Sequence, residues 1–288
     1  MTFPIFIFSI IVFFSLSIKS AYAQTPMDLT VLDYKVERSK LKHEVINSFG
    51  KGRRNNPKYA KNRGMITTGL TPKFDKNLIG RGIDEYWAMD YSKKRGREAY
   101  HGGIDIPAPK GTPILAVASG IVVAKFMNKG NPKGIEIIIR HSPNDIGLSM
   151  WVYSQYTHLL EMPDLKIGQI VKLGDIIAKT SNSGISGKEA KRRYGNSSGK
   201  RGKGNRFGGV RRNALHFGIF YSNSNKYMNN GKFLVPVDAY WMDPNALYKK
   251  TPPYDSKSLK VLSDYQKQIL IPCMLESGEV KPKDTKVI

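Results

Sequence analysis

The chain has 288 residues and a formal net charge of +23 at pH 7, with 46 Lys and Arg against 23 Asp and Glu. Its single cysteine, Cys273, excludes an intramolecular disulfide. The length favours one main domain with smaller additions over two large domains. The positive charge favours partners that are polyanions.

The first 23 residues have the pattern of an export signal. An apolar run from Ile5 to Ile18 is broken only by serines, and Ala21-Tyr22-Ala23 has the form of a cleavage site. The run is too short for a membrane span of about 20 residues. We therefore expect the signal to be cleaved off and the mature protein to lie in the periplasm or outside the cell. An uncleaved anchor is the alternative, because no Lys or Arg precedes the apolar run.

Residues 24–96 are expected to form an N-terminal extension that packs on the main domain or flanks its groove. A helix is predicted near residues 33–46, followed by a stretch rich in Gly, Lys, Arg and Asn at residues 50–63. The C-terminal tail, residues 249–288, begins with two prolines after Thr251 and predicts a second helix near residues 256–270.

Residues 97–248 predict the main domain. Short apolar runs separated by Gly, Pro, Asn and Asp are typical of an antiparallel β architecture. The run at residues 135–140 has little alternation and predicts a buried strand that ends at His141. We interpret His141 as a strand-end residue near the groove, with a catalytic contribution as the alternative, and His43 as a surface residue. The predicted fold class is all-β, mainly antiparallel and sandwich-like, with small helical extensions at both ends.

A basic insertion occupies residues 187–213. It has ten Lys and Arg, one Glu, seven glycines and very few apolar side chains. Such a composition cannot bury a core and predicts a mobile loop. Two interpretations stay open: a solvated loop without a partner, or an electrostatic clamp at the mouth of a groove. Only Tyr194 and Phe207 supply aromatic rings, so a platform for single-stranded nucleic acid is not expected.

A His and an Asp four residues apart suggest part of a metal site. His101 and Asp105 flank Gly102-Gly103, and Pro107 follows them, so a helix is not expected there. A straight strand would separate the two side chains by roughly 13 Å. A strand entry bent at the glycines would bring them together. The spacing alone is equally compatible with a surface histidine beside a turn.

Several further motifs, which follow His101 and Asp105 in a definite order, support the interpretation of this pair as part of a metal site. Residues 101–114 run His-Gly-Gly-Ile-Asp-Ile-Pro-Ala-Pro-Lys-Gly-Thr-Pro-Ile, and they are followed by Ala116–Val122, Tyr156-Thr157-His158-Leu159, the paired glycine turns of 167–177, Leu215-His216-Phe217 and Asp243–Tyr248. Over roughly residues 97–248 the chain resembles the lysostaphin/LytM-type zinc metallopeptidases, also called the Duplicated hybrid motif superfamily. That resemblance implies a curved antiparallel sheet with a long substrate groove.

The resemblance also implies roles for individual residues. His101, Asp105 and His216 would bind Zn²⁺, and His158 would act beside the metal in catalysis. His158 as a packed strand histidine and His216 as a core histidine remain alternatives. One departure concerns the family's His-x-His motif, whose first position is Ala214 in this chain. A methyl group can neither accept a proton nor donate a hydrogen bond, so catalysis is expected to be impaired, altered or rescued by another residue, such as Asn213 or one in the preceding loop.

These observations predict a secreted zinc metalloendopeptidase that hydrolyses peptide bonds in peptidoglycan. The alternative is a catalytically inactive LytM-like zinc-binding envelope protein that binds peptidoglycan or regulates another wall hydrolase. A third interpretation is a basic protein whose charge alone binds the envelope. The expected partner is a peptidoglycan peptide or another anionic envelope polymer; nucleic acid is not favoured, because the chain has an export signal.

Overall fold

The computed structural model describes residues 34–50, 56–74, 91–94, 97–98, 101–128, 133–184, 213–249, 251–271, 273–276 and 279–282. The expected export signal and all of the basic insertion except Asn213 lie outside these residues. Within the described part of the chain, no helix is both long and apolar enough to cross a bilayer.

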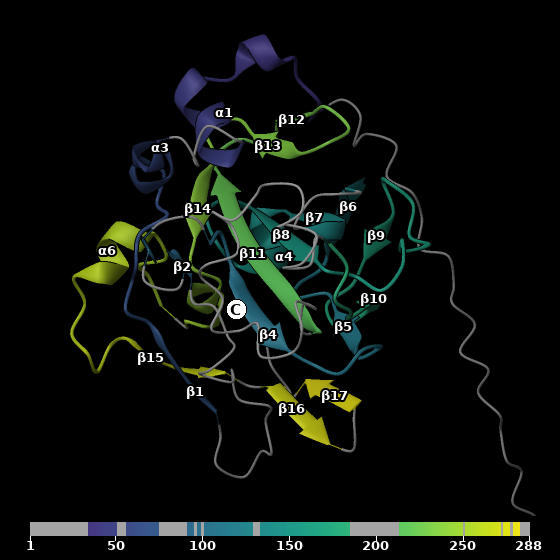
Figure 1. Cartoon of the computed structure of the whole chain (residues 1–288). Helices are drawn as coiled ribbons and strands as arrows, with labels where there is room; N and C mark the ends of the chain where they lie inside the picture. The colour runs from purple at the N-terminus through teal and green to yellow at the C-terminus, as the bar shows by residue number, and fades with distance from the viewer. Residues whose placement is uncertain are drawn as a thin grey trace, which may run out of the picture.

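One mainly antiparallel sheet forms the centre of the molecule (Figure 1). Its strands are β4 (Ile104–Pro107), β6 (Gly120–Asn128), β7 (Gly134–His141), β8 (Trp151–Thr157), β9 (Ile170–Val171), β11 (Ala214–Ser222) and β14 (Tyr240–Met242). The order across the sheet is β14-β11-β8-β7-β6-β9, and β4 pairs with β11. Every pairing in it is antiparallel. The predicted fold class is therefore confirmed.

Shorter elements surround this sheet. The helical ones are η2 (Arg38–Lys40), α1 (His43–Phe49), α3 (Pro57–Asn62), α4 (Pro143–Ile146), η5 (Pro244–Tyr248) and α6 (Ser256–Lys260). The remaining strands are β1 (Thr71–Phe74), β2 (Lys93–Lys94), β3 (Arg97–Glu98), β5 (Pro113–Leu115), β10 (Ile176–Lys179), β12 (Tyr227–Asn229), β13 (Leu234–Pro236), β15 (Gln268–Ile271), β16 (Cys273–Glu276) and β17 (Glu279–Pro282). They form five two-stranded pairs: β1-β15, β10-β5, β12-β13, β16-β17 and β2-β3.

The two expected terminal helices are shorter than the sequence predicts. In the N-terminal segment, Lys35 forms an isolated bridge with Tyr227, and the amide of Val36 donates to the Tyr227 carbonyl at 2.9 Å. These tertiary bonds replace helical ones, so α1 starts only at His43. In the tail, α6 ends at Lys260, and Gln268–Ile271 pairs in parallel with β1.

The register of the sheet assigns side chains to two faces. His216 lies opposite Thr157, and Thr157 lies opposite Glu136, so these three side chains share one face. We call this the site face. Two and four residues further along β11, Gly218 and Phe220 belong to the same face, because side chains alternate along a strand. Phe217 and its partners belong to the opposite face.

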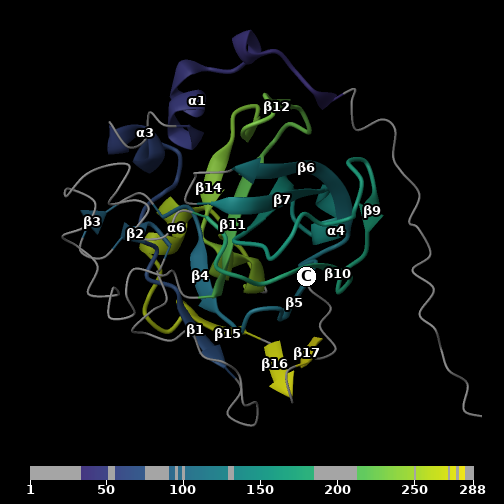
Figure 2. The same ribbon diagram turned by 45° about the vertical axis from the view of Figure 1, so that its right-hand side comes forward.

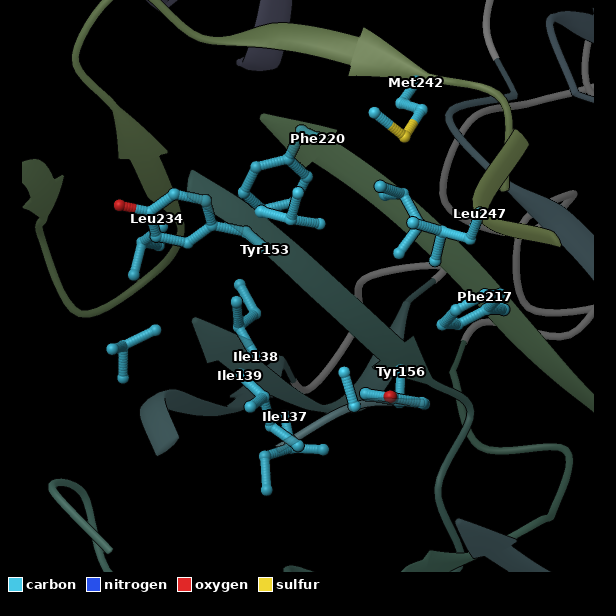
Figure 3. Packing of buried hydrophobic residues seen from close by; sticks show 14 of the residues in the cluster. Ile137, Ile138, Ile139, Tyr153, Tyr156, Phe217, Phe220, Leu234, Met242 and Leu247 are labelled. Atoms are coloured by element: carbon cyan, nitrogen blue, oxygen red, sulfur yellow. The ribbon is translucent and has the colours of Figure 1, made fainter. Parts of the chain in front are cut away.

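Both faces of the central strands are covered by apolar side chains. On the face opposite the site face, Phe217 packs against Tyr156 with ring centroids 5.3 Å apart. On the site face, Tyr153 and Phe220 lie side by side (Figure 3) and stack with ring centroids 5.5 Å apart. Because β7 has buried residues on both faces, it reads as an apolar run, and the prediction of a buried strand there is confirmed.

The N-terminal segment covers the far end of the site face. Phe49, at the end of α1, packs against Phe220 at 5.4 Å and stacks on Trp241 at 4.3 Å. The Ser48 hydroxyl accepts a hydrogen bond from the Trp241 indole at 3.1 Å. Both views place α1 and α3 beside the end of β11 that lies near β12 (Figures 1 and 2). The end of the face that carries His216 lies away from these helices.

His141 is a buried structural residue at the end of β7. Its two ring nitrogens lie 2.7 Å from the Ser119 carbonyl and 2.7 Å from the Ser154 hydroxyl. It pairs with Val152, whereas the opposite end of β8, about 17 Å away along the strand, meets His216. Both ring nitrogens therefore hold the sheet together, and we assign His141 no part in the chemistry.

This burial predicts a pH-dependent contribution to stability. Burial lowers the pKa of His141 to about 4, although the bond to Ser119 opposes the shift. The unfolded chain binds this proton at a pKa near 6.5, so stability is lost as the pH falls from 6.5 towards 4. We expect the difference in unfolding free energy between wild type and His141→Gln to narrow by ~1–3 kcal/mol between pH 7 and pH 4.5 in urea titrations. His43→Gln, at an exposed site, is the control. Parallel pH profiles for wild type and His141→Gln would contradict the assignment.

Candidate metal centre

Three side chains from two separated segments converge at one end of the site face. Nδ1 of His216 lies 3.0 Å from Nε2 of His101 and 2.9 Å from Oδ1 of Asp105. Nε2 of His101 lies 3.1 Å from the same Asp105 oxygen. Among the described residues, these are the group whose ligand atoms could hold a metal ion. The structure therefore brings together the three residues that the sequence suggests as ligands.

Strand pairing produces the convergence. β4 runs antiparallel to β11, and Asp105 is the direct cross-strand partner of His216. Directly opposed residues have Cβ atoms about 5 Å apart, so two short polar side chains can reach one ion between them. His101 lies just before β4, and its carbonyl accepts a hydrogen bond from Ser92 at 2.8 Å. The ligand in the loop is thus held by the segment that precedes it.

Glycines allow this close approach for a reason that differs from the one the sequence suggests. Gly102 and Gly103 do not have the positive φ angles that favour glycine. Instead, a Cβ on Gly103 would lie 2.2 Å from the Phe217 carbonyl oxygen, and one on Gly102 would lie 2.4 Å from the Trp241 ring. Gly218 is restricted in the same way by the Gly102 carbonyl, at 2.7 Å. The strand entry crosses β11 so closely that no side chain fits between them.

The protonation states suit a cation. Burial raises the pKa of Asp105, but the electrostatic effect of His101 and hydrogen bonds from both histidines hold it well below its usual range. Burial lowers the pKa of His216 to about 4, against the opposing effect of Asp105. At pH 7 the carboxylate is therefore ionised and the His216 ring neutral. An ionised carboxylate and an uncharged imidazole are the forms in which these side chains bind a metal.

The donor set and its spacing fit zinc. Two imidazoles and one carboxylate are a usual set for catalytic zinc, which keeps a fourth position open. Ligand atoms around a four-coordinate zinc are about 3.4 Å apart when the metal–ligand bonds are ~2.1 Å. The three separations observed between the ligand atoms are slightly shorter than this. A small outward movement of the side chains would accommodate the ion.

His158 lies beside the three ligands without joining them. Its ring centroid is 6.0 Å from that of His216, and the residue is buried. His158 directly follows β8 and has a φ of 65°. In a regular strand it would point to the face opposite that of Thr157; the positive φ turns the chain at this residue. A β-carbon makes such a conformation costly, and retained strain of this kind is typical of functional sites.

Hydrogen bonds assign the proton on the His158 ring. Nδ1 lies 3.1 Å from the carbonyl oxygen of Lys133 and 3.1 Å from that of Ser183. Carbonyl oxygens only accept hydrogen bonds, so Nδ1 carries the proton and donates. In the neutral ring, Nε2 is then the nitrogen with the lone pair.

Ala214 lies on the site face two residues before His216, and it is buried. Its amide donates to the Ser181 carbonyl at 3.0 Å, and it pairs with Pro107 of β4. Backbone bonds hold this position, and its methyl group provides no proton acceptor. The carbonyl of Asn213 accepts a bond from Ala108 at 3.4 Å. Rescue by Asn213 or by the preceding loop stays a prediction.

Sequence analysis missed a second set of polar residues on the site face. Glu136 is fully buried and lies opposite Thr157, in the same cross-strand row as His216. Lys133 forms an ion pair with Glu136 at 3.3 Å. The available signal was an acid inside an apolar run of isoleucines, at residues 135–139, because acids are seldom buried without a partner.

Replacing single ligands tests the metal centre. His101→Ala and Asp105→Ala are each expected to weaken zinc binding by more than about 100-fold, because losing a direct ligand should cost more than losing a residue that only orients one. His158→Ala is expected to change it little. Competition with a chromophoric chelator measures the affinity, and His43→Ala, at an exposed site, is the control. Equal affinity for wild type and Asp105→Ala would refute the assignment.

Comparisons with known proteins agree with this site. Curated relatives include uncharacterized metalloproteases from Haemophilus influenzae, 34% identical over 91 residues, and from Buchnera aphidicola, 37% identical over 87 residues. The alignments cover 32% and 30% of this chain but only 17% and 20% of those relatives. The chain thus spans about a fifth of the length of the curated relatives it matches.

Several solved structures show a partial likeness to this chain. The catalytic domain of lysostaphin from Staphylococcus simulans is 19% identical, over 51% of this chain and 88% of its own, with a TM-score of 0.32. LytU is 25% identical, over 64% and 98%, with a TM-score of 0.38. A zinc-containing peptidase from Vibrio cholerae is 23% identical, over 55% and 37%, with a TM-score of 0.33.

The family model of Peptidase family M23 matches residues 99–229. This range contains His101, Asp105, His158 and His216, together with all of β4 to β11. The expected resemblance to lysostaphin/LytM-type enzymes is confirmed, and the chain contains a domain of the M23 metallopeptidase family.

Proposed function

We propose that the protein is an exported zinc metalloendopeptidase that hydrolyses peptide bonds in peptidoglycan, at a rate limited by Ala214. The observation that carries the proposal is the convergence of His101, Asp105 and His216 within 2.9–3.1 Å, with His158 beside them. Membership of the M23 family supports peptide hydrolysis as the reaction class.

The proposed mechanism assigns each residue a separate part. His101, Asp105 and His216 would hold the zinc ion. When bound, zinc polarises a carbonyl group and lowers the pKa of a water molecule to about 7. His158, with its proton on Nδ1, offers Nε2 to accept a proton from the attacking water. The carbonyls of Lys133 and Ser183 keep the ring in that orientation.

Ala214 leaves the proposed catalytic arrangement without one of its proton-transferring groups. The family places an imidazole where this chain has a methyl group, so one group that would donate to or accept from the reacting atoms is absent. Loss of a positioned acid–base group typically costs 10²–10⁴-fold in rate. We therefore propose a slow enzyme, in which His158 carries the proton transfers.

The charge of the chain supports an envelope substrate. Removal of the expected signal lowers the net charge only from +23 to +22, because that segment contains Lys19 and no acid. A strongly cationic protein concentrates near anionic polymers. We propose that it is exported and meets the carboxylates of peptidoglycan or other anionic polymers of the envelope there.

The second candidate is a zinc-binding wall protein without hydrolytic activity, and Ala214 is the observation that favours it. In this alternative the metal centre would bind wall peptides or support the regulation of another hydrolase. The two candidates share the fold and the metal site, so only an assay of hydrolysis separates them.

Digestion of purified peptidoglycan tests the proposal. The zinc-loaded protein is expected to release new amino groups, detected by amine labelling and mass spectrometry, from wall with direct cross-links or with oligoglycine bridges. Chelation should stop the release and added zinc should restore it. Ala214→His should raise the rate by about 10²-fold or more, whereas Asp105→Ala should abolish it. Zinc binding without hydrolysis of any wall preparation, even by Ala214→His, would favour the non-hydrolytic candidate.

A further inference from the structure

We propose that an ion pair between the buried Glu136 and the partly exposed Lys133 positions His158 and keeps its proton on Nδ1. This inference rests on the proposed function, in which His158 takes part in the reaction. Neither member of the pair belongs to the three candidate ligands, so both would be positioning residues.

The first observation is the burial of an acid in the sheet. Glu136 is fully buried on β7 between two isoleucines, and Gln155 donates to its Oε1 at 2.6 Å. Lys133 lies 3.3 Å from both carboxylate oxygens. The Lys133 side chain is 30% exposed, whereas the Glu136 carboxylate is desolvated. Such a pair usually adds little net stability, because the cost of desolvation offsets the attraction of the charges. A functional role for the pair accounts for its presence better than stability does.

The second observation is the contact between the main chain of Lys133 and His158. The Lys133 carbonyl accepts a bond from the His158 amide at 3.1 Å and a second from Nδ1 at 3.1 Å. One oxygen therefore fixes both the backbone and the ring of His158. The direction of this carbonyl sets where the ring lies and which nitrogen donates.

The third observation concerns what holds the Lys133 carbonyl in its orientation. Lys133 directly precedes Gly134, which has a φ of 63° and packs so closely on Ser183 that a Cβ would lie 2.5 Å from it. A glycine places little restriction on the residue before it. The side chain of Lys133 supplies the restriction by reaching along β7 to the carboxylate of Glu136.

Together these contacts connect the core of the sheet to the reacting ring. Glu136 on β7 lies directly opposite Thr157, the last residue of β8, and His158 follows Thr157 in the chain. If the pair is broken, the Lys133 carbonyl is expected to rotate and the His158 ring to lose one of its two acceptors. The ring would then adopt both neutral tautomers and a wider range of positions.

Lys133→Met and Glu136→Gln test the inference in the zinc-loaded full-length protein. We expect kcat on peptidoglycan to fall by about 10- to 100-fold with KM changed less than about 2-fold, because displacement of a reacting group by 1 Å can cost 10²-fold. Zinc content should stay unchanged. Lys133→Arg, which can keep the ion pair, should restore most of the rate.

Nitrogen NMR of ¹⁵N-histidine-labelled protein gives a readout that needs no activity. The His158 signal, assigned with His158→Gln, should show a protonated Nδ1 in wild type and Lys133→Arg, and a mixture of tautomers in Lys133→Met. Lys125→Met is the matched control, because Lys125 lies on β6 of the same sheet and bonds to the Pro163 carbonyl at 2.8 Å. An unchanged His158 spectrum in Lys133→Met would overturn the inference, whether or not the wild type hydrolyses wall. Absence of hydrolysis by the wild type would instead count against the proposed function.

Discussion

The pairing of β4 with β11 is the constraint on which the metal centre depends. It places Asp105 directly opposite His216 and sets their ligand atoms 2.9 Å apart. This pairing is possible only because Gly102, Gly103 and Gly218 have no side chains at the point where the two segments cross. A site of this kind tolerates little variation, because a shift by one residue would move Asp105 to the other face of the sheet.

The two ends of β11 have different surroundings. One face of β11 carries His216 at one end and Phe220 at the other, and α1 covers only the Phe220 end. The same strand is therefore core at one end and candidate active site at the other. The strained turn at His158 adds a fourth side chain to this end, and main-chain carbonyls from two separate segments hold its ring. Rigid strands with a few strained residues between them are a suitable support for a reaction that requires accurate placement.

Much of this could be predicted from local sequence, and the failures have specific physical causes. The isoleucine run of β7 and the order of the motifs predict an antiparallel β domain and bring His101, Asp105 and His216 into one group. The predicted terminal helices are too long, because bonds from Val36 to Tyr227 and from β15 to β1 connect residues far apart in sequence. Gly103 is needed for space and not for its backbone angle, which only the packing of β4 on Phe217 reveals. The role proposed for Glu136 and Lys133 could not be predicted from sequence, because it depends on the contact between the Lys133 carbonyl and His158, which are far apart in the chain.

X-ray absorption at the zinc edge of the loaded protein tests the central claim most directly. The account predicts one zinc per chain, bound by two imidazole nitrogens and a carboxylate oxygen at about 2.0–2.2 Å, with the imidazole signal halved in His216→Ala. A spectrum dominated by sulfur, or by six oxygens without imidazole scattering, would contradict it. An unchanged spectrum in His216→Ala would contradict it equally.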